Sequence, residues 1–519
     1  MECVCPHCGK KIGNGQVGFD LTDFIKKQLF LATGFPGIKA PEEERTLVQG
    51  GIEMVFNSLS PGDHLIYCEK EIWNWPLQSG NPVRVVLMGM PYDRLLHLFD
   101  HHRQTSAADN VNKAGEWLRS NKEVLISLCF PLILEKQGNG GILFNLIRTT
   151  FDQSPVVSRR VCPECRGELS FWAGRYEEIC LGVLGGPRVS KTTTVTACAD
   201  LFRQGYEGIT WQGHRTDSEY VKFEEEFLKK YRAGKSIDAT RDIKNNIPKV
   251  SFHVTVQDKR SNVLIKELTL TFVDLPGELN NEAGINDEFY ARYAHYFDNL
   301  DCLWYCTDPG ELLQLTDTAE HSSKVRELGY EGNKKALSTD EICTNMFSVA
   351  FIFNRNGRRV PVAYILGKTD SSLISDTEKN QFHLFHPSCG PNYASGNNPF
   401  EIQFFHREAL AVRSFMAQKN PVLVNTFEQN FPNHGYFAVS AYGFAPSEEE
   451  RRPQPFNVAV PFLWMLALHS CYPITKMIRR RKPFGRVMFE TVSYYLKNAQ
   501  KSEQDKDYYN FFLRGGYLE

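Results

Sequence analysis

One stretch of the chain combines the residue types that bind phosphate. An apolar run, 179–184, precedes a glycine-rich turn, and a segment compatible with a helix follows it. The turn matches the pattern G-x-x-x-x-G-K-[ST], except that Ser190 stands at the second glycine. In such a turn, backbone N–H groups surround a diphosphate, the lysine neutralises its oxygens and the next hydroxyl holds magnesium. The alternative is an ordinary strand–turn–helix. The residues expected to contact phosphate are Gly185, Gly186, Ser190, Lys191, Thr192 and Thr193.

A second motif follows a predicted β-hairpin. Alternating apolar residues predict strands over 249–257 and 264–273, and the second strand runs directly into Asp274, with Gly277 three residues later. In the pattern D-x-x-G, the aspartate reaches magnesium and the glycine N–H senses a γ-phosphate. The motif is weak alone, but its position after a phosphate loop and a hairpin makes it specific. We expect Thr192 and Asp274 to hold Mg²⁺.

Two further motifs favour a guanine base. An apolar strand over 360–366 ends in G-K-T-D, which resembles N-K-x-D with Gly367 in place of asparagine. The aspartate would accept hydrogen bonds from guanine N1 and N2, and the lysine stem would lie over the base. A short strand over 436–439 ends in S-A, whose backbone N–H would reach guanine O6. The residues expected to contact the base are Lys368, Asp370, Ser440 and Ala441.

Four cysteines have the spacing of a zinc site. Cys5 and Cys8 form one C-P-x-C turn, and Cys162 and Cys165 form another. Two such turns supply four thiolates, which close a tetrahedral structural Zn²⁺ site. The usual gap between the turns is about 15–20 residues, so the much longer gap here predicts a zinc ribbon split by an inserted domain. The alternative is two unrelated reduced pairs, or redox pairs.

Composition and charge exclude several classes of protein. The chain has 519 residues and a net charge of −2, so its overall charge does not attract a polyanion. No apolar run reaches the roughly 18 residues of a membrane span, and the first residues are not those of a signal peptide. The 14 cysteines are too dilute for a disulfide scaffold. We therefore expect a cytoplasmic protein.

Strands and helices alternate from residue 176 onward, which predicts an α/β fold with a doubly wound, mostly parallel sheet. Each motif stands at the end of a predicted strand, where such sheets bind nucleotides. In their order and spacing, the four motifs resemble the signature of TRAFAC-class (Ras-like) P-loop GTPases over about 176–475. The resemblance implies GTP and GDP as ligands.

A closer resemblance is to the double-GTPase family of bacterial conflict and defence operons. The residues that carry it are the zinc-ribbon lead-in, the A-G-x-x-x-x-A-T stretch that ends at Thr240, D-L-P-G-E over 274–278 and the apolar segment 455–464. This resemblance implies a regulatory GTPase that acts with a second GTPase and an effector.

The resemblance also assigns catalytic roles. Thr240 would be the switch threonine that closes on magnesium and γ-phosphate; the alternative is a capping or surface residue. Glu278 stands where many relatives have a glutamine that orients water, and its charge would repel the γ-phosphate, so slow hydrolysis is expected. Arg188 would act as an arginine finger, unless it points to solvent or to a partner. With Lys191, these are the candidate catalytic residues.

Two departures from the family pattern leave the function open. Ser190 adds a side chain where the loop packs on phosphate, and Gly367 lacks the amide that ties the base loop to the phosphate loop. One alternative is therefore a degenerate GTPase-fold scaffold that binds partners. Another is a nucleic-acid-binding module built on the zinc ribbon and the basic run 479–482, which lacks the basic surface such modules need.

These interpretations divide the chain into four parts. The predicted parts are a split zinc ribbon over 1–12 and 159–175, an inserted α+β domain over 13–158 without an assigned role, a P-loop GTPase domain over 176–475, and a C-terminal helical tail over 476–519.

Overall fold

The computed structural model describes most of the chain, and short gaps interrupt several of the described ranges. These ranges are 3–68, 84–136, 144–237, 249–275, 296–314, 337–381, 402–443 and 452–494. The chain divides into two compact units, Met1–Glu178 and Ile179–Glu519. The finer division into four parts stays a prediction.

The first unit contains a small helical core. Apolar residues recur three and four positions apart on α2, and Val48, Ile52 and Val55 are buried there. Gly51 lets this helix approach α5 closely, because a Cβ at Gly51 would overlap the backbone of Asn110 in that helix. The helices of this unit are α1 (Thr22–Ala32), α2 (Glu42–Asn57), α4 (Met90–Thr105), α5 (Asp109–Ser120) and α6 (Lys122–Leu128).

Besides the short antiparallel pair of β1 (Cys3–Val4) and β2 (Lys11–Ile12), the described part of the first unit contains two small antiparallel sheets. One has the order β4-β3-β9, and the other has the order β5-β6-β7-β8. Their strands are β3 (Gly18–Asp20), β4 (Ile66–Cys68), β5 (Arg84–Leu87), β6 (Leu132–Lys136), β7 (Phe144–Thr149), β8 (Val156–Val157) and β9 (Arg159–Val161). The first unit thus combines helices with antiparallel strands.

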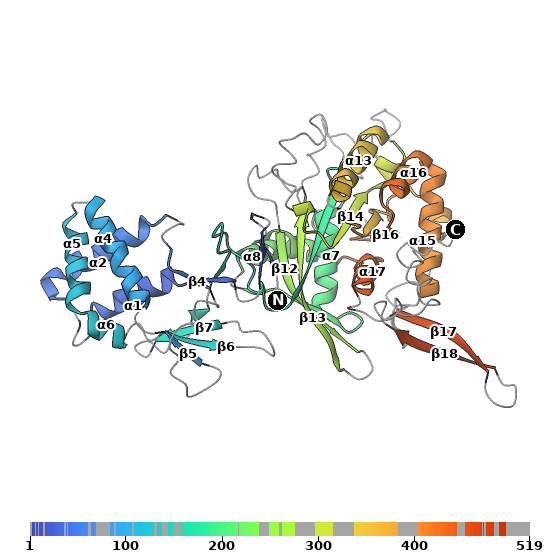
Figure 1. The fold of residues 1–519 in the computed structure, drawn as a ribbon. Helices are drawn as coiled ribbons and strands as arrows, with labels where there is room; N and C mark the ends of the chain where they lie inside the picture. Colours follow the sequence, from blue (N-terminus) through green and yellow to red (C-terminus); the bar gives the residue numbers. More distant parts are fainter. Residues whose placement is uncertain are drawn as a thin grey trace. The chain divides into compact units, whose positions relative to one another are not determined.

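The second unit is built on a seven-stranded sheet with the order β11-β12-β13-β10-β14-β15-β16. Strands β10, β14, β15 and β16 are parallel, whereas β11, β12 and β13 pair antiparallel. The strands are β10 (Glu177–Gly185), β11 (Ile209–Gln212), β12 (Lys249–Gln257), β13 (Leu264–Asp274), β14 (Cys302–Thr307), β15 (Val362–Leu366) and β16 (His434–Ala438) (Figure 1).

Apolar residues on both faces explain why the sheet is covered on both sides. On β14, Trp304 belongs to one hydrophobic cluster and its neighbour Tyr305 belongs to the other. Alternate side chains of a strand point to opposite faces, so a continuous apolar strand must be buried twice. Helices α7 (Lys191–Arg203) and α17 (Val460–Leu468) contribute to the first cluster, and α13 (Thr339–Arg355), α15 (Ile402–Lys419) and α16 (Pro421–Asn430) contribute to the second. The predicted doubly wound α/β fold is confirmed.

The structure differs from the sequence-based expectation at two places. The polar stretch after α7 contains an edge strand, β11, followed by α8 (Ser218–Phe223), a π-helical turn over Glu224–Leu228 and α9 (Lys229–Arg232). The helical tail predicted over 476–519 is wrong where it begins, because β17 (Ile474–Arg481) and β18 (Val487–Tyr494) form an antiparallel pair. Alternating β-branched and aromatic residues in β18 favour a strand over a helix.

Among the helices of the described ranges, none combines the length and the apolar character that a membrane crossing requires.

Candidate functional sites

The predicted phosphate loop joins β10 to α7. β10 ends at Gly185 and α7 begins at Lys191, with Ser190 as its N-cap. Gly185 has a φ of 149°, and a Cβ there would overlap the carbonyl oxygen of Cys306. Only glycine fits at this position, where the chain passes from the strand into the loop. Ser190 has a φ of 69°, a left-handed conformation that costs a non-glycine residue roughly 1–2 kcal/mol. This geometry explains why glycine is common at that position. Arg188 is left-handed as well and half-buried.

Lys191 is buried at the start of α7 and folds back over the loop. Its Nζ donates to the carbonyl oxygens of Gly185 at 3.0 Å and Gly186 at 2.7 Å. An ammonium has three protons, so one remains for a ligand at the mouth of the loop. The first turn of α7 directs its backbone N–H groups to the same place, where the helix dipole favours an anion. The arrangement is suited to a phosphate group.

Thr192 and Asp274 are in contact although they are distant in sequence. The Thr192 hydroxyl donates a short hydrogen bond to Oδ2 of Asp274, which is the last residue of β13. A hydroxyl and a carboxylate are hard oxygen donors of the kind that Mg²⁺ prefers. The residues predicted to hold magnesium therefore fit that ion in type and in placement. Thr193, the next residue of α7, is half-buried.

The base loop rests directly on the phosphate loop. The Gly367 N–H donates to the carbonyl oxygen of Thr307 at 2.8 Å. A Cβ at Gly367 would lie 3.1 Å from the carbonyl oxygen of Val189 and 3.8 Å from the Cβ of Ser190. A Cβ at this position would therefore lie tightly against the backbone of the phosphate loop. This backbone contact joins the base loop to the phosphate loop, in place of the asparagine amide that Gly367 lacks.

This packing predicts the effect of restoring asparagine. We expect Gly367→Asn to destabilise the second unit by about 1–3 kcal/mol, because the added Cβ would lie tightly against the Val189 carbonyl oxygen and the phosphate loop would have to shift slightly. Thermal unfolding measures the change. Gly357→Asn is the matched control, since Gly357 has a φ of 63°, which asparagine tolerates, and no heavy atom lies within 4 Å of its Cβ position. Equal melting temperatures for Gly367→Asn and the control would contradict the expectation.

The two predicted base motifs contact each other. Ser440 Oγ donates to Oδ1 of Asp370 at 2.6 Å and accepts from the Gly443 N–H at 2.8 Å. Lys368 Nζ pairs with the buried carboxylate of Asp308 at 3.1 Å. The lysine side chain is thus held at its backbone end and at its ammonium end. Ala441, beside Ser440, is buried. The Asp370 carboxylate is thus bonded to the S-A motif, and the lysine stem is held by a separate ion pair with Asp308.

Two acidic residues of this region were missed by sequence analysis. Asp308 caps α11 (Pro309–Leu312) by accepting from the Glu311 N–H at 3.1 Å, and Glu311 is fully buried against Gly186. The sequence T-D-P-G directly after a predicted strand was the available signal, since aspartate before proline is typical of a helix start. Burial, together with the charge of Asp308, raises the pKa of the Glu311 carboxyl well above its usual range.

The raised pKa makes stability depend on pH. Glu311 keeps its proton in the folded protein at pH values where the unfolded chain has lost it, so stability falls as pH rises above about 4.5. We expect Glu311→Gln to raise the stability at pH 7.5 by about 1–3 kcal/mol and to flatten this dependence. Denaturant unfolding from pH 5 to 8 measures both. Glu225→Gln removes an exposed carboxylate on the same unit and should change neither the stability at pH 7.5 nor its pH dependence. If the stability of Glu311→Gln varied with pH as steeply as that of the unmodified protein, the assignment would be refuted.

Three predicted site residues lie outside the described residues. These are Thr240, Gly277 and Glu278. Their roles stay predictions.

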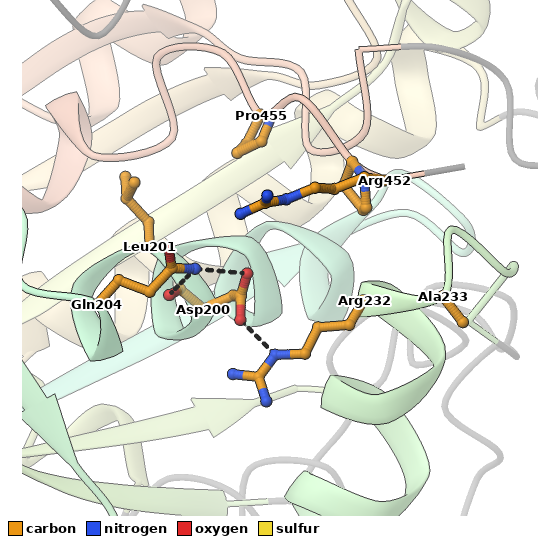
Figure 2. Close-up of a pocket in the computed structure, with 8 residues that line it drawn as sticks. Asp200, Leu201, Gln204, Arg232, Ala233, Arg452 and Pro455 are labelled. Atoms are coloured by element: carbon orange, nitrogen blue, oxygen red, sulfur yellow. Dashed lines mark hydrogen bonds and ion pairs between the residues drawn. The ribbon is translucent and has the colours of Figure 1, made fainter. Parts of the chain in front are cut away.

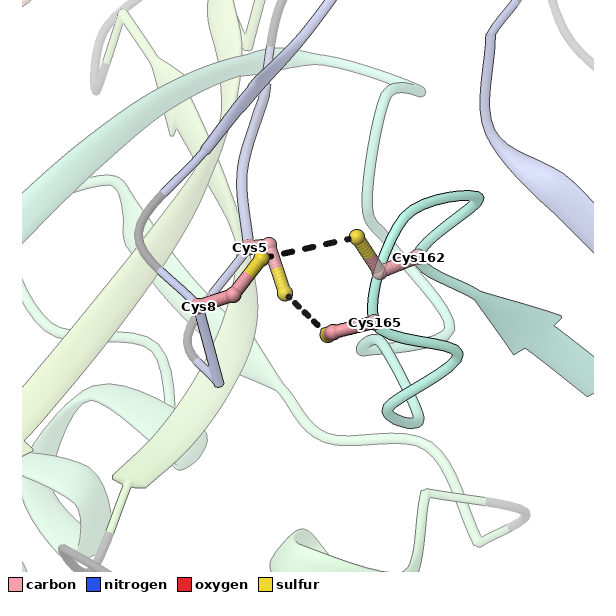
Figure 3. Close-up of side chains that lie close together, drawn as sticks. All are labelled: Cys5, Cys8, Cys162 and Cys165. Atoms are coloured by element: carbon pink, nitrogen blue, oxygen red, sulfur yellow. Dashed lines mark hydrogen bonds between the residues drawn. The ribbon is translucent and has the colours of Figure 1, made fainter. Parts of the chain in front are cut away.

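In the first unit, the four predicted zinc ligands meet (Figure 3). Cys5 and Cys8 lie in the turn between β1 (Cys3–Val4) and β2 (Lys11–Ile12), and Cys162 and Cys165 lie in the turn after β9. All four sulfur atoms lie within 4.8 Å of one another. The sulfurs of Cys5 and Cys165 are 3.6 Å apart, and those of Cys8 and Cys162 are 3.8 Å apart. Tetrahedral Zn–S bonds of about 2.3 Å require similar sulfur separations.

The two cysteine turns are also joined by other contacts. His7 Nε2 bonds the carbonyl oxygen of Glu168 at 2.8 Å, and Lys10 pairs with Glu164 at 2.8 Å. His7 is therefore engaged with the opposite turn. Burial raises the pKa of the Cys5 thiol, so a cation is needed to keep such sulfurs ionised. The chemistry of the four donors fits Zn²⁺.

A cavity of about 690 Å³ lies in the second unit, at the end of α7 opposite the phosphate loop. Figure 2 shows Asp200 on its floor, bonded to Gln204 and Arg232, with Arg452 reaching over it. The remaining lining residues are Leu201, Ala233, Pro453 and Pro455. None of the residues predicted to hold nucleotide lines this cavity.

Comparisons with known proteins leave the family open. No known protein family and no curated protein matches the chain. The chain is similar to a small GTPase, Arl6 (BBS3), of Trypanosoma brucei, solved with the nucleotide analogue GppNp, at 12% identity and a TM-score of 0.23, over 56% of this chain and 95% of that one.

Two other solved structures give similar values. One is a GTP-binding protein of Sulfolobus solfataricus in complex with GDP, at 8% identity and a TM-score of 0.21, over 67% of this chain and 60% of that one. The other is a single-residue variant of Era from Aquifex aeolicus bound to GDP·AlF4⁻, at 10% identity and a TM-score of 0.21, over 61% of this chain and 78% of that one. The fold assignment rests on the strand order of the sheet and not on these values.

Proposed function

We propose that the chain is a guanine-nucleotide-binding switch with slow GTP hydrolysis. One observation carries the proposal: residues from four separate motifs meet at the carboxyl ends of neighbouring strands. Lys191 covers the phosphate loop, Thr192 bonds Asp274, and Asp370 bonds Ser440. A sheet of this strand order binds nucleotides at that edge.

Each group has a distinct part in binding. Lys191 and the N–H groups of the phosphate loop would neutralise the β- and γ-phosphates. Thr192 and Asp274 would hold Mg²⁺, which supplies positive charge to the phosphates during transfer. One oxygen of Asp370 is bonded to Ser440, which leaves Oδ2 to accept from the base. Ala441 would offer its N–H to guanine O6.

Slow hydrolysis follows from the residues assigned to the reaction. Glu278 would polarise the attacking water, but its charge opposes that of the γ-phosphate. Thr240 would close on magnesium when the γ-phosphate is present, and its release after hydrolysis would be the switch. Arg188, in the phosphate loop, would add positive charge where the transition state develops negative charge.

The wider role we propose is regulatory. In line with the resemblance to the double-GTPase family, the nucleotide state would control a second GTPase or an effector in a bacterial defence system. A zinc ion held by the four cysteines would be structural, since four thiolates leave no open position for catalysis.

A scaffold that does not bind nucleotide is the second candidate. Ser190 and Gly367 favour it, because the phosphate and base loops pack on each other at these positions. The proposed switch needs this packing to leave the mouth of the loop open.

Titration with fluorescent GDP, GTP and ATP in magnesium separates the two candidates. We expect micromolar or tighter binding of GDP and GTP and at least about tenfold weaker binding of ATP, because the Asp370 carboxylate repels the lone pair of adenine N1. Asp370→Ala should remove this preference while keeping phosphate affinity. Asp376→Ala, which removes an exposed carboxylate on the same unit, is the control. Absence of binding to all three nucleotides would favour the scaffold.

A further inference from the structure

A buried aspartate directly after β14 is engaged at both of its carboxylate oxygens. Asp308 is 0% exposed, and its backbone is extended, with a φ of −128°. Pro309 favours this conformation in the residue before it and is the first residue of α11. Oδ1 accepts from the Glu311 N–H at 3.1 Å, and Oδ2 pairs with Lys368 Nζ at 3.1 Å. The start of α11 therefore fixes the carboxylate that receives the lysine.

The backbone of Lys368 is fixed as well. Lys368 has a left-handed φ of 50°. The residue before it, Gly367, donates its N–H to the carbonyl oxygen of Thr307 at 2.8 Å. The residue after it, Thr369, donates its N–H at 3.3 Å and its hydroxyl at 3.0 Å to the carbonyl oxygen of Val439. The backbone and the ammonium of Lys368 are thus both held, and the four-carbon stem joins them.

Such an arrangement matters because lysine is a flexible side chain. A lysine without a partner occupies many rotamers, and ordering it during binding lowers the affinity for the ligand. The Lys368 side chain is 21% exposed and already has its partner in Asp308. Because Asp308 engages the ammonium, the surface that the side chain offers to a ligand is its apolar stem. An apolar stem is suited to the face of a flat base.

We propose that Asp308 is a positioning residue that preorganises Lys368 for contact with the nucleotide base. This proposal rests on the proposed function and adds to it a residue outside the four motifs. Asp308 needs no contact with nucleotide, because it acts through the ammonium of Lys368. The stem is ordered before the base arrives, so binding does not carry the entropic cost of ordering it.

A comparison of two ligands tests this role. Asp308→Asn keeps an oxygen that caps α11 but removes the charge that pairs with Lys368. In the full chain with magnesium, we expect it to weaken GDP binding roughly five- to twentyfold. Inorganic pyrophosphate, measured by competition with fluorescent GDP, should change less than about twofold because it has no base. Equal losses for GDP and pyrophosphate would indicate a merely structural role and would overturn the proposal.

Two further variants guard against an effect on folding. Asp217→Asn is the matched control, because Asp217 is a buried aspartate that caps α8 in the same unit. α8 packs on β12 through Tyr220 and Phe252, and the sheet order separates β12 from β15 by β13, β10 and β14. Asp217→Asn should leave both ligands unchanged. Asp308→Ser, which also caps a helix, replaces Asp308→Asn if circular dichroism shows that the latter does not fold.

A double-mutant cycle shows whether Asp308 acts through Lys368. Lys368→Met keeps an unbranched stem and removes the ammonium. In that background, Asp308→Asn should change the Kd of GDP by less than about twofold, because no ammonium remains to be positioned. A full loss from Asp308→Asn in both backgrounds would overturn the role of Asp308 while leaving the proposed function intact. Failure of the unmodified protein to bind GDP would contradict the proposed function itself, and the role of Asp308 would fall with it.

Discussion

Lys191→Ala should weaken the binding of GDP and GTP at least about a hundredfold, the largest loss expected from a single substitution in the second unit. Hydrogen bonds to a charged group contribute about 1.5–3 kcal/mol each, and a hundredfold change is about 2.7 kcal/mol. The Lys191 ammonium also closes the loop by bonding the carbonyl oxygens of Gly185 and Gly186. Its removal takes away both the positive charge and the contact that shapes the loop.

Two controls separate binding from folding. Lys222→Ala removes an exposed lysine of α8 and should leave both affinities unchanged. Lys191→Arg keeps the charge but changes its geometry, and we expect it to recover only part of the affinity. Equilibrium titration with a fluorescent nucleotide gives the values, and circular dichroism shows whether each variant folds. If folded Lys191→Ala bound GDP with unchanged affinity, Lys191 would not belong to the binding site.

Cys162→Ser should abolish stoichiometric zinc and unfold the cysteine cluster in the first unit. Structural zinc sites of this type contribute roughly 10–16 kcal/mol of apparent binding free energy. That is comparable to the whole free energy of unfolding of a native protein, about 5–15 kcal/mol. The strands that flank the first turn are short, since β1 and β2 have two residues each. We therefore expect metal loss to be visible as loss of structure.

Metal analysis and hydrogen exchange measure the two parts of this prediction. The unmodified chain should hold one zinc per molecule, Cys162→Ser should hold none, and exchange around the two turns should become fast. Cys3→Ala is the matched control, because Cys3 is buried beside the cluster and is not one of its four ligands. One zinc retained in Cys162→Ser, or lost in Cys3→Ala, would show that the ligand set is different.

The sequence by itself determined the order of elements in the second unit. Uninterrupted apolar runs predicted strands at the positions of β10 and β15, and alternation predicted the β12–β13 hairpin to within one residue of its bounds. These signals are local, because burial on both faces of a sheet leaves an apolar residue at nearly every position of a strand. The two cysteine turns were likewise readable, since the ligand spacing of a zinc site is short.

Other features depended on tertiary contacts. β11 is a short edge strand inside a polar stretch, and only its pairing with β12 makes it a strand. The strands at 474–494 stand where a helical tail was predicted. The prediction was wrong because residues of one segment do not reveal the pairing of β17 with β18. Periodicity in short segments does not decide between helix and strand without such partners.

The site shows the same division between local and tertiary information. The sequence predicted Lys191, Asp274 and Asp370 from motif order, but it treated Ser190 and Gly367 as two separate defects. In the structure these positions are neighbours, since a Cβ at Gly367 would lie 3.8 Å from the Cβ of Ser190 and 3.1 Å from the carbonyl oxygen of Val189. Asp308 and Glu311 belong to no motif. Contacts between distant segments decide their environment, and no local pattern of residues records such contacts.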